Sequence, residues 1–240
     1  MSPIQARTVN LYSREFYQLA AERLNKDGLM MQWLPLHLVG PDDAKSILKT
    51  FQEVYPHTSI WNSFLTRIVL LVGSKEEIAL DKIRFEELMR IPEIQNSAQQ
   101  IGINTFLDFT DFFLTDANKV NSFMQNADLI TDDRPLLEFS PATLLPPLKL
   151  EVDEIFLNYL KYRVGNYPQV RGMMPSEKRR WEKDFRTRTA QRLSVFSRRY
   201  HGPGESAFNK RNYSEGLDEV ATYLDNKKDQ PIRLKGIQWE

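Results

Sequence analysis

The first 56 residues change from helical to extended spacing of apolar positions and back. A helix is expected from Asn10, whose side chain can accept hydrogen bonds from the first turn. Its apolar positions recur at steps of three and four: Tyr12, Phe16, Leu19, Ala20 and Leu24. The run LMMQWLPL at 29–36 predicts a buried strand. Gly40-Pro41 predicts the start of a second helix, because proline suits the first helical position, and Pro56 ends it.

Two further strands are predicted at 59–61 and 67–72, joined by the short link 62–66. The link is too short for a parallel crossover, so the two strands should be antiparallel. Helices that alternate with strands are typical of an α/β sheet. Residues 81–125 are mostly helical by composition, with amphipathic patches at 83–89 and 106–113.

The pattern changes after the prolines at 141, 146 and 147. A short helix is predicted at 155–162, and a long one starts at Pro175. One face of the long helix is apolar and carries Trp181, Phe185, Thr189, Leu193, Phe196 and Tyr200. The segment His201-Gly202-Pro203-Gly204 ends it, and a last helix is expected at 207–224.

Charge divides the chain at the same place. Residues 1–142 hold 13 basic and 19 acidic residues, whereas residues 143–240 hold 19 basic and 13 acidic residues. This asymmetry predicts two units with different surfaces. The chain has no cysteine, which excludes disulfides and thiol nucleophiles. Its longest aliphatic run, 68–72, is far shorter than the ~20 residues that span a bilayer.

Four segments, in this order and spacing, resemble the spermidine synthase (polyamine aminopropyltransferase) family, and most of all its bacterial membrane-fused-type branch. They are NLYSREFYQLAAERLNKDGLMMQWLPLH at 10–37, FQEVYPH at 51–57, LLVGS at 70–74 and TDDRPLLEF at 131–139. The resemblance covers about residues 3–142. It implies a Rossmann-like, methyltransferase-type fold that transfers an aminopropyl group from decarboxylated S-adenosylmethionine to a diamine such as putrescine.

The resembling family keeps its cofactor site in the first half of the domain. That half carries a glycine-rich loop after the first strand, and a catalytic aspartate after the fourth. The resemblance begins just after the place of that aspartate: Pro3 matches the proline that follows it, and Ser2 is not acidic. We therefore expect residues 1–142 to be the C-terminal part of such a domain, without catalytic residues or a bound cofactor, and residues 143–240 to be a basic helical extension.

Two candidate substrate-binding residues lie on predicted strands. The resemblance places Gln32 where the family lines its amine pocket, and Trp61 near an aromatic residue that covers the alkyl chain of the substrate. The alternatives are structural. Gln32 can bond to backbone at the end of a strand, and Trp61 can be an ordinary core residue.

Asp132 and Asp133 are the other candidates for binding an amine. A carboxylate about 4 Å from an ammonium group attracts it by roughly 1–4 kcal/mol, depending on exposure. In an extended segment, however, adjacent residues point to opposite faces. One of the two can then face a pocket while the other binds Arg134, a backbone N–H group or water. Alternatively both belong to a solvated turn, as aspartates commonly do.

The long basic helix permits a nucleic-acid interpretation, because residues 171–199 hold ten Lys and Arg against three acidic residues. The charges surround the apolar face instead of forming one separate face. This pattern favours a solvated helix over a helix that binds nucleic acid. The three histidines, His37, His57 and His201, are far apart and form no metal motif.

The sequence thus predicts an α/β fold, the C-terminal half of a Rossmann-like sheet followed by an α-helical extension. We expect no aminopropyl transfer by the chain alone and a cytoplasmic location. In the resembling fold, the strand at 29–36 has the strand at 67–72 on one side, with that at 59–61 beyond it at the edge. The other side of 29–36 would be unpaired, so a complementary N-terminal half or a second copy is the expected partner. The alternative is a non-catalytic module whose basic tail binds nucleic acid, an anionic membrane or another chain.

Overall fold

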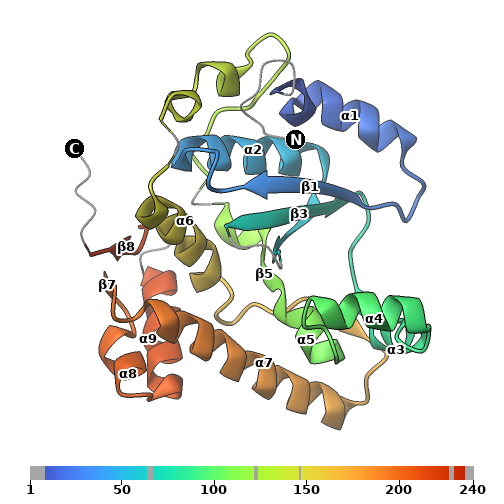
Figure 1. The fold of residues 1–240 in the computed structure, drawn as a ribbon, viewed down its shortest axis with the longest axis vertical. Coiled ribbons are helices and arrows are strands. Elements are labelled where there is room, and N and C mark those ends of the chain that lie inside the picture. Colours follow the sequence, from blue (N-terminus) through green and yellow to red (C-terminus); the bar gives the residue numbers. More distant parts are fainter. Residues whose placement is uncertain (1–8, 64–66, 122–123, 146, 227–229, 236–240) are drawn as a thin grey trace.

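A computed structural model describes residues 9–63, 67–121, 124–145, 147–226 and 230–235. Ser2 and Pro3 lie outside the described residues. The chain is a mixed α/β protein whose main sheet has four strands: β1 (Met30–Pro35), β2 (His57–Asn62), β3 (Ile68–Ser74) and β5 (Phe113–Asp116). Figure 1 shows α1 (Arg14–Arg23) and α2 (Pro41–Val54) on one side of this sheet, with α5 (Phe106–Asp111) and α7 (Pro175–Phe196) on the other.

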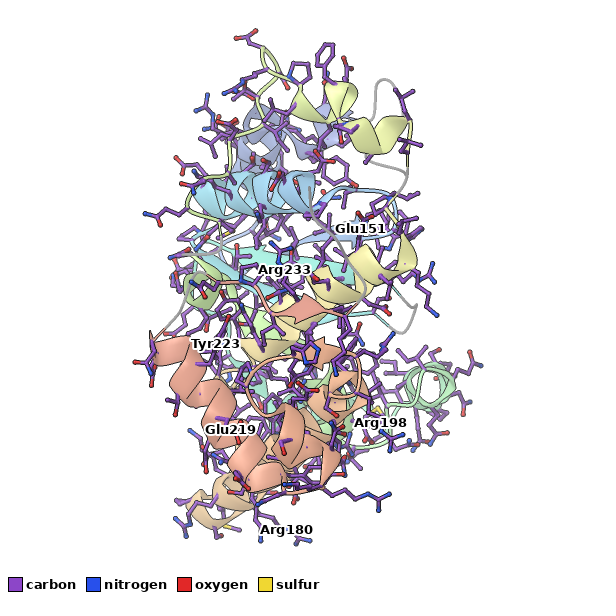
Figure 2. The ribbon with its side chains drawn as sticks, turned by 90° about the vertical axis from the view of Figure 1, so that its left-hand side faces the viewer. Glu151, Arg180, Arg198, Glu219, Tyr223 and Arg233 are labelled. Carbon is purple, nitrogen blue, oxygen red and sulfur yellow. The ribbon has the colours of Figure 1, made fainter. Side chains whose placement is uncertain are left out.

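The remaining elements are short or lie in the second half of the chain. The helices are η1 (Val9–Tyr12), α3 (Lys82–Leu88), α4 (Pro92–Gln100), η2 (Ala117–Val120), η3 (Leu136–Phe139), η4 (Pro141–Thr143), α6 (Lys149–Lys161), α8 (Glu205–Asn209) and α9 (Tyr213–Asn226). Two small sheets pair β4 (Leu80–Asp81) with β6 (Val170–Arg171), and β7 (Tyr200–His201) with β8 (Arg233–Leu234). Figure 2 shows Glu219 and Tyr223 along α9.

The strand order of the main sheet is β1-β3-β2-β5, and every neighbouring pair is antiparallel. The expected antiparallel pairing of β2 with β3 is confirmed. So is the position of β3 between β1 and β2. The expectation that β2 forms the edge is wrong, because β5 pairs along its outer side. The helical patch predicted at 106–113 in fact ends at Asp111, and the strand follows almost at once.

Three other expected elements differ from the structure. The long helix ends at Phe196, and Tyr200, expected on its apolar face, belongs to β7. The first α-helix starts at Arg14 and is capped by Ser13, whose hydroxyl accepts from the N–H of Phe16, whereas Asn10 belongs to a separate 3-10 turn. The last predicted helix is two helices, α8 and α9, because Arg211 between them has a positive φ of 60° that a continuous helix does not allow. The sequence gives no sign of this break, because arginine does not usually adopt a positive φ.

Helix α2 lies close against the sheet because Gly73 leaves room for it. A Cβ atom at Gly73 would stand 2.5 Å from the ring of Phe51 and 2.6 Å from Cβ of Tyr55. Both aromatic residues are fully buried, with ring centroids 4.9 Å apart. Position 73 therefore needs a residue without a side chain.

The two segments on either side of residue 142 share one hydrophobic core. A single buried cluster contains Ile47 and Leu71 from the first segment together with Leu157 and Leu193 from the second. The guanidinium group of Arg163, just after α6, adds polar links, because it donates to both the backbone and the carboxylate of Asp111. The change of charge near residue 142 is therefore not a break in the core.

Candidate functional site

Strand β1 forms one edge of the main sheet, and β5 forms the other. Leu36 N donates to the carbonyl of Arg67 over 2.9 Å, just beyond the pairing of β1 with β3. Residues of an antiparallel strand alternate in direction, so the backbone groups of Met31 and Trp33 point away from β3. Among the described residues, no other strand pairs with β1 on that side. Met31 is also 60% exposed, so the expectation of a fully buried strand is wrong at this edge.

Gln32 lies at this free edge together with Tyr12. The side-chain amide of Gln32 donates to the carbonyl of Trp33 over 3.2 Å, and the hydroxyl of Tyr12 donates to the same carbonyl over 3.3 Å. Burial raises the pKa of Tyr12 to about 12, although its hydrogen bond with Gln32 lowers it. The phenol is therefore protonated at neutral pH and acts as a hydrogen-bond donor. The hydrogen bond from Gln32 to the backbone agrees with the structural alternative for this residue. Its side chain is nevertheless only partly buried at the edge of the sheet.

Trp61 points to the opposite face of the sheet from Gln32. The register aligns Gln32 with Leu71, and Leu71 with Ile60, so these three side chains share one face. Trp61 follows Ile60 directly and must therefore project from the other face. Its ring lies 5.5 Å from that of Phe113, in an edge-to-face arrangement. In the described part of the chain, Gln32 and Trp61 consequently lie on opposite faces of the sheet.

Asp132 and Asp133 form the exposed tip of a tight turn. Thr131 and Arg134 exchange backbone hydrogen bonds of 3.4 and 3.1 Å across it, so the segment has the turn conformation that was one of the two expectations. The guanidinium group of Arg134 binds both carboxylate oxygens of Asp128, at 3.3 and 3.1 Å, and neither of the two adjacent aspartates. The extended conformation assumed for this pair is wrong, because the backbone reverses direction here.

The start of α1 connects this turn to the free edge. Arg14 N donates to the carbonyl of Ile130 over 2.9 Å, and Glu15 Oε2 accepts from the N–H of Asp132 over 3.0 Å. Tyr12, two residues before Arg14, contacts the carbonyl of Trp33. The segment 12–15 thus has Gln32 near one end and Asp132 near the other. The role of both residues in binding an amine remains a prediction.

A cavity of about 520 Å³ lies beside Trp61, at the start of β2 and the side of α7. Its aromatic lining includes Trp61, Tyr167 and Trp181. Its charged lining consists of Glu77, Asp116, Glu182, Lys119 and Lys178. Aromatic faces and carboxylates together can hold an organic ammonium group. The cavity has no signal in the sequence, because its walls come from segments that are far apart and carry no shared motif.

The histidines do not form a metal centre. His37 and His201 make hydrogen bonds to different partners, the carbonyl of Arg67 and the carboxylate of Glu205, and His57 lines the cavity beside Trp61. Within the described part of the chain, no group of three or more potential ligands is placed to hold a metal ion.

Comparisons of the chain with protein-family models, with curated proteins and with solved structures find no match. Among the described residues, no helix is both long enough and apolar enough to cross a membrane.

Proposed function

We propose that this chain is the C-terminal half of a spermidine synthase-like, Rossmann-like domain. In this proposal the chain has no aminopropyltransferase activity alone. It gains activity when a complementary half, carrying the cofactor loop and the catalytic aspartate, adds a strand to the free edge of β1. The intact site would use decarboxylated S-adenosylmethionine as co-substrate and a polyamine precursor such as putrescine as acceptor.

The observation that carries the proposal is the order β1-β3-β2, with β3 antiparallel to both neighbours and β1 at the edge. This is the order that the resemblance implies for these three strands, although β5 pairs beyond β2, where the resemblance implies an edge. The outward N–H and carbonyl of Met31 and the N–H of Trp33 would then bond to the missing fourth strand, whereas the carbonyl of Trp33 already accepts from Gln32 and Tyr12. An unpaired strand edge is a ready template for another chain.

Gln32 and Tyr12 give the proposal a chemical role for this edge. Both side chains hydrogen-bond to the carbonyl of Trp33, where an added strand would close over them. In the completed site, Gln32 would bind the amine substrate. Deprotonation of the attacking amine would fall to the aspartate of the other half, since an ionised carboxylate can serve as both base and anchor. Trp61 would not contribute to this site, because it projects from the opposite face and lines the cavity of about 520 Å³.

An assay of aminopropyl transfer tests the proposal. The pure chain should give no turnover of decarboxylated S-adenosylmethionine and putrescine, because half a pocket cannot position both substrates. Co-expression with strands one to four of an intact spermidine synthase-like protein should restore transfer. In the restored enzyme, Gln32→Ala should raise KM for putrescine, whereas Gln95→Ala on the exposed face of α4 should not. Turnover by the chain alone, or no transfer from a stable complex, would refute the proposal.

The alternative is a binding module that uses the basic helix α7. Arg186, Arg188 and Arg192 on α7 pair with Asp218, Asp108 and Asp111. These pairs neutralise much of the charge that a nucleic acid or an anionic membrane would need. Arg180 remains exposed at the end of the molecule farthest from α1 in Figure 2. Tight binding of DNA or RNA that weakens steeply with salt would favour this alternative.

A further inference from the structure

A second cavity, of about 530 Å³, lies where β2 ends, between the first turn of α6 and the end of α7. Four cationic side chains line it, from Arg67, Lys149, Arg192 and Arg199. Among the described residues of its lining, Asp153 is the only carboxylate. The lining of the cavity therefore carries a formal surplus of three positive charges. None of the four candidate substrate-binding residues, Gln32, Trp61, Asp132 and Asp133, is in this lining.

Two of the four cations are held in place by carboxylates. Arg192 Nη2 donates to Asp111 over 2.8 Å, and Arg199 Nη1 donates to Asp153 over 2.9 Å. Asp111 is shared, because it also pairs with Arg163 at 2.5 Å. One carboxylate that serves several guanidinium groups cannot neutralise them all. The two arginines are thus held in position, and the charge of the four cations is only partly compensated.

The other two cations, Arg67 and Lys149, have no ion-pair partner among the described residues and are exposed. Arg67 has a positive φ of 65°, an uncommon conformation for a non-glycine residue. Its carbonyl accepts from Leu36 N, which holds this conformation at the start of β3. Unusual backbone conformations that the surrounding structure maintains often mark binding sites.

The floor of the cavity is apolar. Phe196 is 8% exposed and Val152 is 1% exposed, and the rings of Phe156 and Phe196 lie 6.1 Å apart. The guanidinium group of Arg199 lies 5.2 Å from the centre of the Phe196 ring. A ligand that matches this lining needs an anionic group for the cations and an apolar body for the rings. Arginine forks match the geometry of phosphate and carboxylate groups.

We infer that this cavity binds a small organic anion, with a phosphate or carboxylate group held by Arg67, Lys149 and Arg199 and an apolar body resting on Phe156 and Phe196. The inference does not depend on the proposed aminopropyltransferase ancestry, because it concerns a different part of the sheet. It assigns to the region around residue 149 a binding role in addition to its packing role.

Calorimetric titration of the full chain with phenyl phosphate at low ionic strength tests the inference. Phenyl phosphate should bind saturably and more tightly than inorganic phosphate, because the ring adds apolar contact. Benzylamine, which has a similar ring but the opposite charge, should not bind at this cavity. Benzoate in place of phenyl phosphate distinguishes a carboxylate site from a phosphate site.

Variants locate the binding. Arg67→Gln and Lys149→Gln should each weaken phenyl phosphate binding roughly 5-fold or more, the effect of losing about 1 kcal/mol of charge attraction. Neither side chain belongs to an ion pair of the described structure, so the melting temperature should stay near that of the wild type. Arg179→Gln, on the exposed side of α7, is the matched control and should leave binding unchanged. Absence of phenyl phosphate binding, or equal weakening by all three variants, would overturn the inference.

Discussion

Arg163 and Asp111 form a buried ion pair that joins the two segments of the chain, with Arg163 Nη2 2.5 Å from Asp111 Oδ1. The side chain of Arg163 is fully buried and that of Asp111 is 14% exposed. Arg163 Nε also donates to the hydroxyl of Thr189 on α7 over 2.8 Å, and its guanidinium lies 3.9 Å from the centre of the Phe185 ring. One side chain thus contacts α7 and the end of α5 at once.

Breaking this pair should destabilise the whole chain. Asp111→Asn leaves the guanidinium of Arg163 buried without its counter-charge, which typically costs about 3–5 kcal/mol. Arg186→Gln is the matched control: it breaks an exposed pair with Asp218, and such pairs contribute about 0–1 kcal/mol. Urea unfolding followed by circular dichroism measures both changes. Equal effects of the two substitutions would contradict the role given to Arg163.

Stability should fall in acid through the same site. Burial raises the pKa of Asp111, but the charges of Arg192 and Arg163 outweigh this, so the pKa lies below its ordinary value. The unfolded chain therefore binds a proton at Asp111 more readily than the folded chain does. The stabilisation is fully present above the unfolded pKa of about 4 and is lost as pH falls through the lower folded value. Melting temperatures from pH 7 to pH 2 should fall less steeply for Asp111→Asn than for the wild type.

Trp181 should stabilise both segments and not α7 alone. Its ring is 5% exposed, packs 5.4 Å from that of Phe185, and donates from Nε1 to Thr110 Oγ1 over 3.0 Å. Trp181→Ala should cost about 3–5 kcal/mol. Fluorescence of the remaining tryptophans and far-ultraviolet circular dichroism should show the same single unfolding transition. Its midpoint should lie at a lower denaturant concentration than that of the wild type. Two separate transitions would show that residues 143–240 unfold independently.

Gly73→Ala tests the close approach of α2 to the sheet. The added methyl group would overlap the Phe51 ring, and overpacking of this kind costs about 1–3 kcal/mol. Gly202→Ala is the control, because its nearest neighbour, an atom of Tyr200, lies at an ordinary 3.5 Å. Thermal melts should separate the two variants clearly. A Gly73→Ala protein as stable as the wild type would mean that α2 does not lie against β3 as described.

Helix starts and strand neighbours were predictable where the local signal is strong. Pro41 and Pro175 mark the first residues of α2 and α7, as proline at the first helical position predicts. The short link before β3 correctly predicted antiparallel pairing. Strand β5 was missed because four residues within an aromatic-rich stretch carry no distinct alternation. Its position depends on pairing with β2, which is a tertiary contact.

The candidate site was less predictable than the fold. The opposite directions of Gln32 and Trp61 follow from the register of β1, β3 and β2, which sequence spacing does not fix. Asp132 and Asp133 were correctly placed in a turn as one alternative, but the partner of Arg134 is Asp128, six residues before it. The turn brings Arg134 close to Asp128, whereas an extended segment would keep the two residues apart.

The two strand candidates should respond differently in a reconstituted enzyme. Gln32→Ala should raise KM for the amine with little loss of stability, because among the described residues its side chain bonds to the backbone of Trp33 and to Tyr12 at the edge. Trp61→Ala should lower the melting temperature, because the ring packs against Phe113 and Phe109. Kinetics and melts on both variants measure the difference. A raised KM without destabilisation for Trp61→Ala would place the amine on the other face of the sheet.

Complex formation by an edge variant tests the half-domain account most directly. Met31→Pro removes an N–H group that points away from β3, so pairing within the sheet should survive, as proline does at strand edges. Met31→Ala keeps that N–H group and is the matched control. Each variant is mixed with a chain carrying the cofactor loop and strands one to four, and the complex is measured by analytical ultracentrifugation. The account predicts a complex with Met31→Ala and none with Met31→Pro; equally stable complexes with both would show that strand addition at β1 does not join the halves.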